Sequence, residues 1–216
     1  MLIWEYKFDM SDIKVQNKES QILEAAEHEF LEKGYGGART ASIAKAAGVT
    51  HAMLHYYYRT KEQLFERVMD KKMSELIPMI SHLFGNASLP LTERIKEAVS
   101  IHFDFVSANP ELPRFLVNEV LPNAERFNVL KSNIEGYSHL FTELQKEVDE
   151  AASRGEIESF DVLLLFQTVL SLNVFPSLMV NVMTNVADGE KQVLKELFAA
   201  RKAENVEIIM RRIRKV

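Results

Sequence analysis

The spacing of Ala44, Gly48 and Leu54 is the feature that most constrains the fold of this chain. A small residue, a Gly four positions on and an apolar residue six further on are typical of two short helices joined by a tight turn. The small residue lets the helices approach, Gly relaxes the turn, and the apolar residue anchors the second helix. Thr50 is a good N-cap for that second helix. We therefore predict a helix-turn-helix over about residues 39–58.

The charge of the same stretch points to a polyanionic partner. Between residues 33 and 61 there are five basic residues and no acidic one, in a chain with a formal net charge of −5. The five are Lys33, Arg39, Lys45, Arg59 and Lys61. A small basic region on an acidic protein is expected where that region binds phosphates, because released counterions supply much of the affinity for nucleic acid.

Residues 20–66 resemble the N-terminal domain of the TetR/AcrR family of transcriptional repressors. The family pattern places an aromatic residue before a Gly-aromatic pair, then I-A-x-x-A-G-V-[ST], then an apolar residue and aromatic residues, and finally K-x-x-L. The matching residues are Phe30, Gly34, Tyr35, Ile43, Ala44, Ala47, Gly48, Val49, Thr50, Leu54, Tyr57, Tyr58, Lys61 and Leu64. Two departures concern DNA contacts: Ala38-Arg39 replaces a frequent Thr/Ser pair, and His55 replaces the usual Tyr. The resemblance implies a DNA-binding repressor that works as a homodimer.

The composition predicts an all-α fold. The chain has 216 residues, of which 47% are hydrophobic, and only 8 Gly and 6 Pro. Such a length can bury a sizeable core, and the alternating β-branched segments that announce sheets are missing. We divide the chain into an N-terminal extension (1–17), a helix-turn-helix DNA-binding domain (18–64) and a C-terminal helical domain for effector binding and dimerisation (65–216). The boundary is expected inside a helix that runs from residue 61 to about 84.

Apolar periodicity and breaks predict the other helices. We expect a first helix over about 18–33, and C-terminal helices over about 91–108, 111–121, 125–154, 160–186 and 189–214. The charge-free stretch from Val162 to Ala187 is long enough for a membrane span, but its many Asn, Ser and Thr residues favour a buried or interfacial helix. In the family the last two long helices pair with those of a second subunit. The resemblance therefore makes 160–186 and 189–214 the expected dimer interface, with no membrane partner.

Candidate DNA-binding residues lie on and around the predicted helix pair. A recognition helix presents its N-terminal residues to base edges in the major groove, and a cation at a helix N-terminus is suited to bind phosphate. The candidates are Arg39, Thr40, Lys45, Thr50, His51, Ala52, His55, Tyr56 and Lys61. The i, i+4 spacing of His51 and His55 also fits metal ligands, but Ala52 stands where a metalloprotease motif requires Glu, so we predict no metal site.

Candidate effector-binding residues lie on apolar helical stripes of the C-terminal domain. Small-molecule pockets are mostly apolar with a few polar groups, and several stripes carry one. The candidates are His102, Phe105, Phe115, Glu119, Tyr137, Phe141 and Asn173. Each could equally be a core residue, since buried His and Asn side chains are usually satisfied within the protein.

The sequence offers no catalytic constellation. There is no Cys, so thiolate chemistry, disulfides and thiolate metal sites are excluded, and there is neither a G-x-S-x-G elbow nor a phosphate-binding glycine loop. The first residues lack the pattern of a signal peptide, which favours the cytoplasm. We therefore predict a non-enzymatic regulator without a cofactor, which binds a near-palindromic operator and is released by a small, largely apolar effector. The alternative is a helical small-molecule-binding protein with a vestigial DNA module.

Overall fold

The computed structural model describes residues 10–86, 88–135, 138–180, 182, 184 and 191–215. In these ranges the regular structure is helical, apart from one isolated bridge between Ile157 and Arg214, so the predicted all-α fold is confirmed. The chain forms two compact units, Met1–Lys71 and Lys72–Val216, which are described separately.

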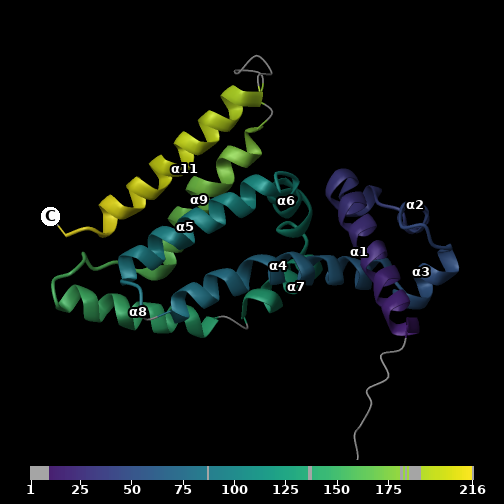
Figure 1. Cartoon of the computed structure of the whole chain (residues 1–216), viewed down its shortest axis with the longest axis horizontal. Helices are drawn as coiled ribbons and strands as arrows, with labels where there is room; N and C mark the ends of the chain where they lie inside the picture. Colours follow the sequence, from purple (N-terminus) through teal and green to yellow (C-terminus); the bar gives the residue numbers. More distant parts are fainter. Residues whose placement is uncertain are drawn as a thin grey trace, which may run out of the picture. The chain divides into compact units, whose positions relative to one another are not determined.

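The first unit contains three helices and the start of a fourth: α1 (Met10–Gly37), α2 (Thr40–Ala46), α3 (His51–Tyr57) and α4 (Lys61–Gly85) (Figure 1). The helix predicted over 18–33 is thus longer at both ends, but its backbone kinks at Gly34, where φ is 70°. The side chains that fill the core of this unit come from all four helices and the segments between them: Ile22, Ala26, Phe30, Ala38, Ile43, Ala44, Ala47, Leu54, Tyr58, Leu64, Phe65, Val68 and Met69.

The second unit contains the rest of α4 and the helices that follow it. These are α5 (Leu91–Ala108), α6 (Glu111–Phe115), the π-helix η1 (Leu116–Val120), α7 (Ala124–Glu135), α8 (Ser138–Ser153), α9 (Val162–Leu178) and α11 (Lys191–Ile213). The structure reproduces the predicted ends of α5. Pro78 lies inside α4 without ending it.

Three predicted helices of the second unit differ from the structure. The helix expected over 160–186 reaches only Leu178 in α9, where Met179 caps it. The helix expected over 125–154 is divided into α7 and α8, with Gly136, a residue of low helix propensity, in the sequence between them. The helix expected over 111–121 widens into a π-helix after Phe115, where Leu121 N–H bonds to Leu116 O at 2.9 Å. The boundary predicted between the helices at 160–186 and 189–214 lies outside the described residues.

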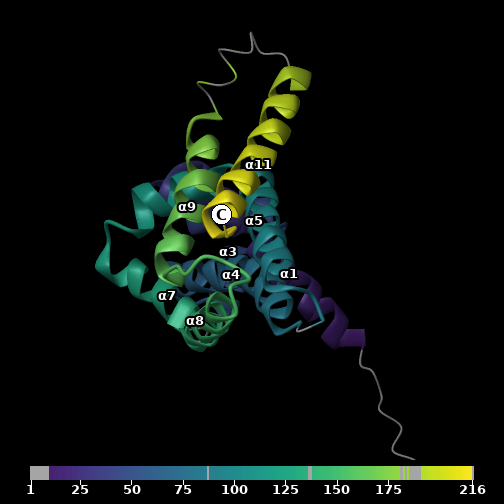
Figure 2. The ribbon, with the colours of Figure 1, turned by 90° about the vertical axis from the view of Figure 1, so that its left-hand side faces the viewer.

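The core of the second unit lies where α5, α9 and α11 pack against one another, with α8 beside α9 (Figures 1 and 2). Its buried members are Leu91, Ile95, Val99, Val148, Ala151, Ile157, Phe160, Val162, Leu165, Ile209 and Ile213. At the end of α8, Gly155 adopts a φ of +74° and the chain turns toward α9. None of the helices in the described part of the chain is long and apolar enough to span a membrane.

A buried polar link joins the three central helices of this unit. Asn173 on α9 donates from Nδ2 to Val99 O at 2.9 Å and to Nδ1 of His102 on α5 at 3.1 Å. Asn205 on α11 in turn donates to Oδ1 of Asn173 at 3.0 Å. Because His102 accepts through Nδ1, its ring is neutral in this arrangement, and burial lowers its pKa to about 4.

The buried His102 should make the stability of the protein depend on pH. The folded state holds the imidazole neutral down to about pH 4, whereas an unfolded histidine takes up a proton near pH 6.5. The free energy of unfolding should therefore fall as the pH drops from about 6.5 to 4, by on the order of 2–3 kcal/mol from this residue. Urea unfolding of the wild type and His102→Gln at pH 7.5 and 4.5 measures the effect, and the variant should lose less stability than the wild type. Equal losses in the two proteins would show that His102 does not contribute.

Candidate nucleic-acid interface

The turn between α2 and α3 depends on Gly48. Its φ is +62°, a left-handed conformation that side chains disfavour. Gly48 N–H bonds to Lys45 O at 3.2 Å and Val49 N–H bonds to Ala44 O at 3.0 Å. These two bonds form a Schellman motif, which satisfies the last carbonyls of α2 and redirects the chain. The role predicted for Gly48 from the sequence is confirmed.

Local caps and one buried side chain fix α3. The hydroxyl of Thr50 accepts the N–H of Met53 at 3.1 Å, so Thr50 is the N-cap that the sequence predicts. Leu54 is only 1% exposed and packs in the same core as Ile43 and Ala44 of α2. The opposite face of α3 is left free, since Tyr56 is 83% exposed.

Most of the predicted DNA-binding residues are available to a partner. Seven of the nine are exposed, and the other two, Thr40 and Lys61, are partly exposed. The exposed ones are Arg39, Lys45, Thr50, His51, Ala52, His55 and Tyr56. Tyr58 is 7% exposed and Tyr57 is half-buried, as expected for core and boundary aromatics. The structure thus places eight of the nine candidates on α2, α3 and their N-cap residues, and Lys61 at the start of α4.

Three of the basic side chains on this surface have no internal counterion. In the part of the chain that the structure describes, Arg39, Lys45 and Arg59 form no ion pair. Lys33 differs, because its ammonium lies 2.6 Å from the carboxylate of Glu29. An unpaired exposed cation can neutralise a phosphate without first giving up an internal partner.

Glu29 has a positioning role that the sequence did not reveal. Its side chain is almost buried, and besides Lys33 it accepts the backbone N–H of Arg39 at 3.2 Å, just before α2 begins. Burial by itself raises the pKa of this carboxyl, but the hydrogen bonds from Lys33, Arg39 and Ser42 hold the pKa below its ordinary value. The carboxylate therefore fixes the start of α2 on α1.

Lys61 is held at the start of α4 by a neighbouring aromatic ring. The side chain of Thr60 accepts the N–H of Gln63 at 3.1 Å and so caps the N-terminus of this helix. The ammonium of Lys61 lies 4.6 Å from the centre of the Tyr35 ring, and the Tyr35 hydroxyl donates to Glu62. A cation over an aromatic face gains roughly 0.5–1 kcal/mol at exposed sites. Tyr35 thus restricts Lys61 near the positive end of the helix, where a phosphate would bind.

The two histidines of α3 are ordered by different partners. Nε2 of His51 lies 3.0 Å from the hydroxyl of Thr40, and Nδ1 of His55 lies 3.3 Å from the backbone oxygen of Arg59. Their rings stand edge to face with centres 4.4 Å apart. Among the described residues, no group of three or more His, Cys, Asp or Glu side chains could hold a metal ion.

The structure brings only some of the predicted effector-binding residues together. His102 and Asn173 bond to each other, Glu119 pairs with Arg126 at 3.2 Å, and Phe141 packs on Phe166 with ring centres 5.3 Å apart. Phe115 is buried in α6, Phe105 is half-buried on α5, and Tyr137 lies outside the described residues. A hollow of about 460 Å³ on the second unit is lined by none of them. These residues remain predictions.

The fold and the basic helix pair define a class of protein: an all-helical regulator with an N-terminal helix-turn-helix. Residues 22–68 match the sequence model of the family described as bacterial regulatory proteins, tetR family. Residues 22–68 thus carry the N-terminal domain of this family, and the comparisons support a TetR-family DNA-binding regulator.

Individual relatives agree with this family. The chain is 31% identical to the nucleoid occlusion factor SlmA of Mannheimia succiniciproducens over 108 residues, which are 50% of each protein. It is 26% identical to the fatty acid metabolism regulator protein of Bacillus subtilis over 154 residues, 70% of this chain and 77% of the relative. The chain thus spans only about half of the length of the nucleoid occlusion factor.

Solved structures share the fold over nearly their whole length. FadR from Bacillus subtilis, crystallised in complex with stearoyl-CoA, superimposes with a TM-score of 0.66 at 21% identity, covering 89% of this chain and 97% of FadR. HlyIIR, a hemolysin II transcriptional regulator, superimposes with a TM-score of 0.61 at 23% identity, covering 88% and 97%. At these identities the likeness establishes the fold.

Replacing Lys61 should weaken binding to DNA of every sequence by a similar factor. If Lys61 contacts a phosphate as predicted, Lys61→Ala removes that contact and leaves the base edges untouched, so we expect roughly a threefold to tenfold loss on both specific and random duplexes. Fluorescence anisotropy with labelled DNA measures the affinities.

Lys18→Ala is the matched control for Lys61→Ala. It removes the same charge from α1, where Lys18 bonds only to Gln21 in the described structure, at 2.9 Å. This control should bind DNA as the wild type does. Unchanged affinity of Lys61→Ala for random DNA would refute the phosphate assignment.

Proposed function

We propose that this protein represses transcription as a homodimer that binds a near-palindromic operator and is released by a small, largely apolar effector. The observation that carries the proposal is the surface of α2 and α3: exposed side chains suited to base and phosphate contacts, with the unpaired cations Arg39, Lys45 and Arg59, on a chain of net negative charge. These side chains do not pack in the core of the unit. Their exposure and charge suit a helix that lies in the major groove.

The surface of α9 supports dimerisation. The helix carries no charged residue between Val162 and Leu178, yet it exposes large apolar side chains, among them Leu163, Leu164 and Phe175, which is 60% exposed. Helix α11 adds Val193, Leu197 and Ile208. A helix that is apolar all round is normally buried, and a second copy of the chain would bury this one. We therefore place the dimer interface on helices at about 160–186 and 189–214.

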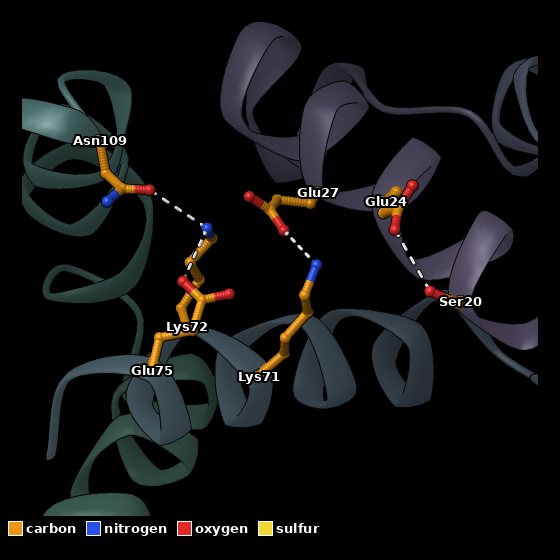
Figure 3. Close-up of polar contacts among 7 residues, drawn as sticks. All are labelled: Ser20, Glu24, Glu27, Lys71, Lys72, Glu75 and Asn109. Carbon is orange, nitrogen blue, oxygen red and sulfur yellow. Dashed lines mark hydrogen bonds and ion pairs between the residues drawn. The ribbon is translucent and has the colours of Figure 1, made fainter. Parts of the chain in front are cut away.

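Helix α4 supports communication between the operator and the effector. It is continuous from Lys61 to Gly85, although the two compact units divide after Lys71. Within the first unit Lys71 pairs with Glu27 of α1 at 3.0 Å. Within the second unit Lys72 bonds to Asn109, at the end of α5, at 3.1 Å (Figure 3). Adjacent residues of one continuous helix thus each bond within a different unit, and we infer that a movement of α5 is passed along α4.

The effector should bind the second unit and favour a dimer whose recognition helices are wrongly spaced. FadR, a structural neighbour, was crystallised with stearoyl-CoA, which supports an effector with a long apolar part. A coupling of roughly 1–3 kcal/mol would shift operator affinity about 5- to 150-fold. Operator DNA must then weaken effector binding by the same factor. We place this exchange in the cytoplasm, where an operator is accessible.

Selection of random duplex DNA on the purified protein tests this function. We expect an enriched near-palindrome, because two recognition helices about one DNA turn apart, on the order of 34–36 Å, read two related half-sites. The bound pool is sequenced after several rounds at moderate salt. A variant with Ala at both His51 and Tyr56, checked for folding by circular dichroism, is the control and should enrich a different or weaker site. No enrichment by folded, dimeric wild type would contradict the proposal.

A further inference from the structure

The hydrogen bond of His55 determines which of its ring nitrogens carries the proton. Nδ1 lies 3.3 Å from the backbone oxygen of Arg59, just beyond the end of α3. A carbonyl oxygen only accepts hydrogen bonds, so Nδ1 must be the donor. In the neutral imidazole the other nitrogen, Nε2, then carries a lone pair and acts only as an acceptor.

The acceptor nitrogen of His55 is available and its ring is restrained. His55 is exposed, and no group in the described part of the chain bonds to Nε2. The ring also stands edge to face with that of His51, which in turn contacts the hydroxyl of Thr40 at 3.0 Å. Two neighbours therefore limit the rotation of His55, and a restrained acceptor loses less conformational entropy when it binds.

An acceptor can read only part of the major groove. The donors on base edges there are the exocyclic amino groups, N6 of adenine and N4 of cytosine. Guanine offers the acceptors O6 and N7, thymine offers O4 and a methyl group, and phosphate oxygens also only accept. A neutral His55 with its proton on Nδ1 therefore has a partner on adenine or cytosine, and none on guanine or the phosphate backbone.

We propose that His55 is a specificity-determining residue that accepts a hydrogen bond, through Nε2, from the amino group of an adenine or cytosine in each half-site. This inference rests on the proposed function, because it requires an operator. It adds to the proposed function the chemistry of one contact between protein and base. Arg or Lys, the usual readers of guanine, donate, whereas this position accepts.

The test first locates the base pair that His55 reads. The wild type and His55→Ala are compared at pH 8 on operators with each base pair replaced in turn. We expect one base pair in each half-site to matter to the wild type and not to the variant. His28→Ala, which removes an exposed imidazole from α1, is the matched control and should keep the wild-type preference at that base pair.

Base analogues then identify the group that is read. At that position adenine is replaced by purine, or cytosine by 2-pyrimidinone, each of which lacks only the exocyclic amino group. The wild type should lose roughly fivefold to tenfold in affinity, the size of one hydrogen bond, while His55→Ala should bind both duplexes equally. A 7-deaza analogue of the purine of that pair, which lacks the N7 acceptor and keeps the amino group of adenine, should leave the wild type unaffected.

Each other outcome overturns the inference. Sensitivity to loss of N7 instead of the amino group would mean that His55 donates to a purine. A uniform loss of affinity of His55→Ala on all sequences would mean that it contacts the phosphate backbone. Either result leaves an operator-binding protein and thus the proposed function. Absence of sequence-specific binding by the wild type would refute both.

Discussion

The turn at Gly48 is the constraint on which the DNA-facing surface depends. Helices α2 and α3 have only seven residues each, and helices of this length are not stable in water by themselves. Their geometry comes from the left-handed Gly48, from the burial of Leu54 and from the carboxylate of Glu29, which holds the start of α2. A substitution that disturbs any one of these three features would move His51 and His55 relative to the rest of this surface.

Opposite charges are separated along the chain in a way that suits an allosteric DNA reader. The stretch from 33 to 61 is basic, while the chain as a whole has a net charge of −5. The acidic remainder is repelled by DNA, so attraction is confined to the helix-turn-helix. Helix α9 is apolar and carries no charge, so no electrostatic repulsion opposes its packing against a second copy of itself.

Features set by neighbouring residues could be predicted from the sequence. The cap at Thr50, the turn at Gly48, the burial of Leu54 and the ends of α5 all follow from local patterns, and the structure confirms them. The exposure of the DNA-binding candidates was also predictable, because a short helix packs one face into the core and leaves the other face exposed.

Features that join distant parts of the chain could not be predicted. Glu29 reaches Arg39 ten residues away, and Tyr35 holds Lys61 across 26 positions. The bond between His102 and Asn173 spans 71 positions, and no periodicity announces it. The division of α7 from α8 could not be predicted because the apolar stripe continues past Gly136. A continuous stripe is a stronger signal for one helix than a single helix-disfavouring residue is against it.

The salt dependence of DNA binding by the wild type tests the central claim most directly. Affinity for a random duplex is measured between about 50 and 300 mM salt, and the logarithm of the affinity is plotted against that of the salt concentration. Each phosphate neutralised contributes a slope of about −0.9, so a dimer using Arg39, Lys45, Arg59 and Lys61 on both subunits should give a slope of roughly −4 to −7. A flat plot, or no binding above background in folded dimeric protein, would contradict the account and favour a small-molecule-binding protein whose DNA module is a relic.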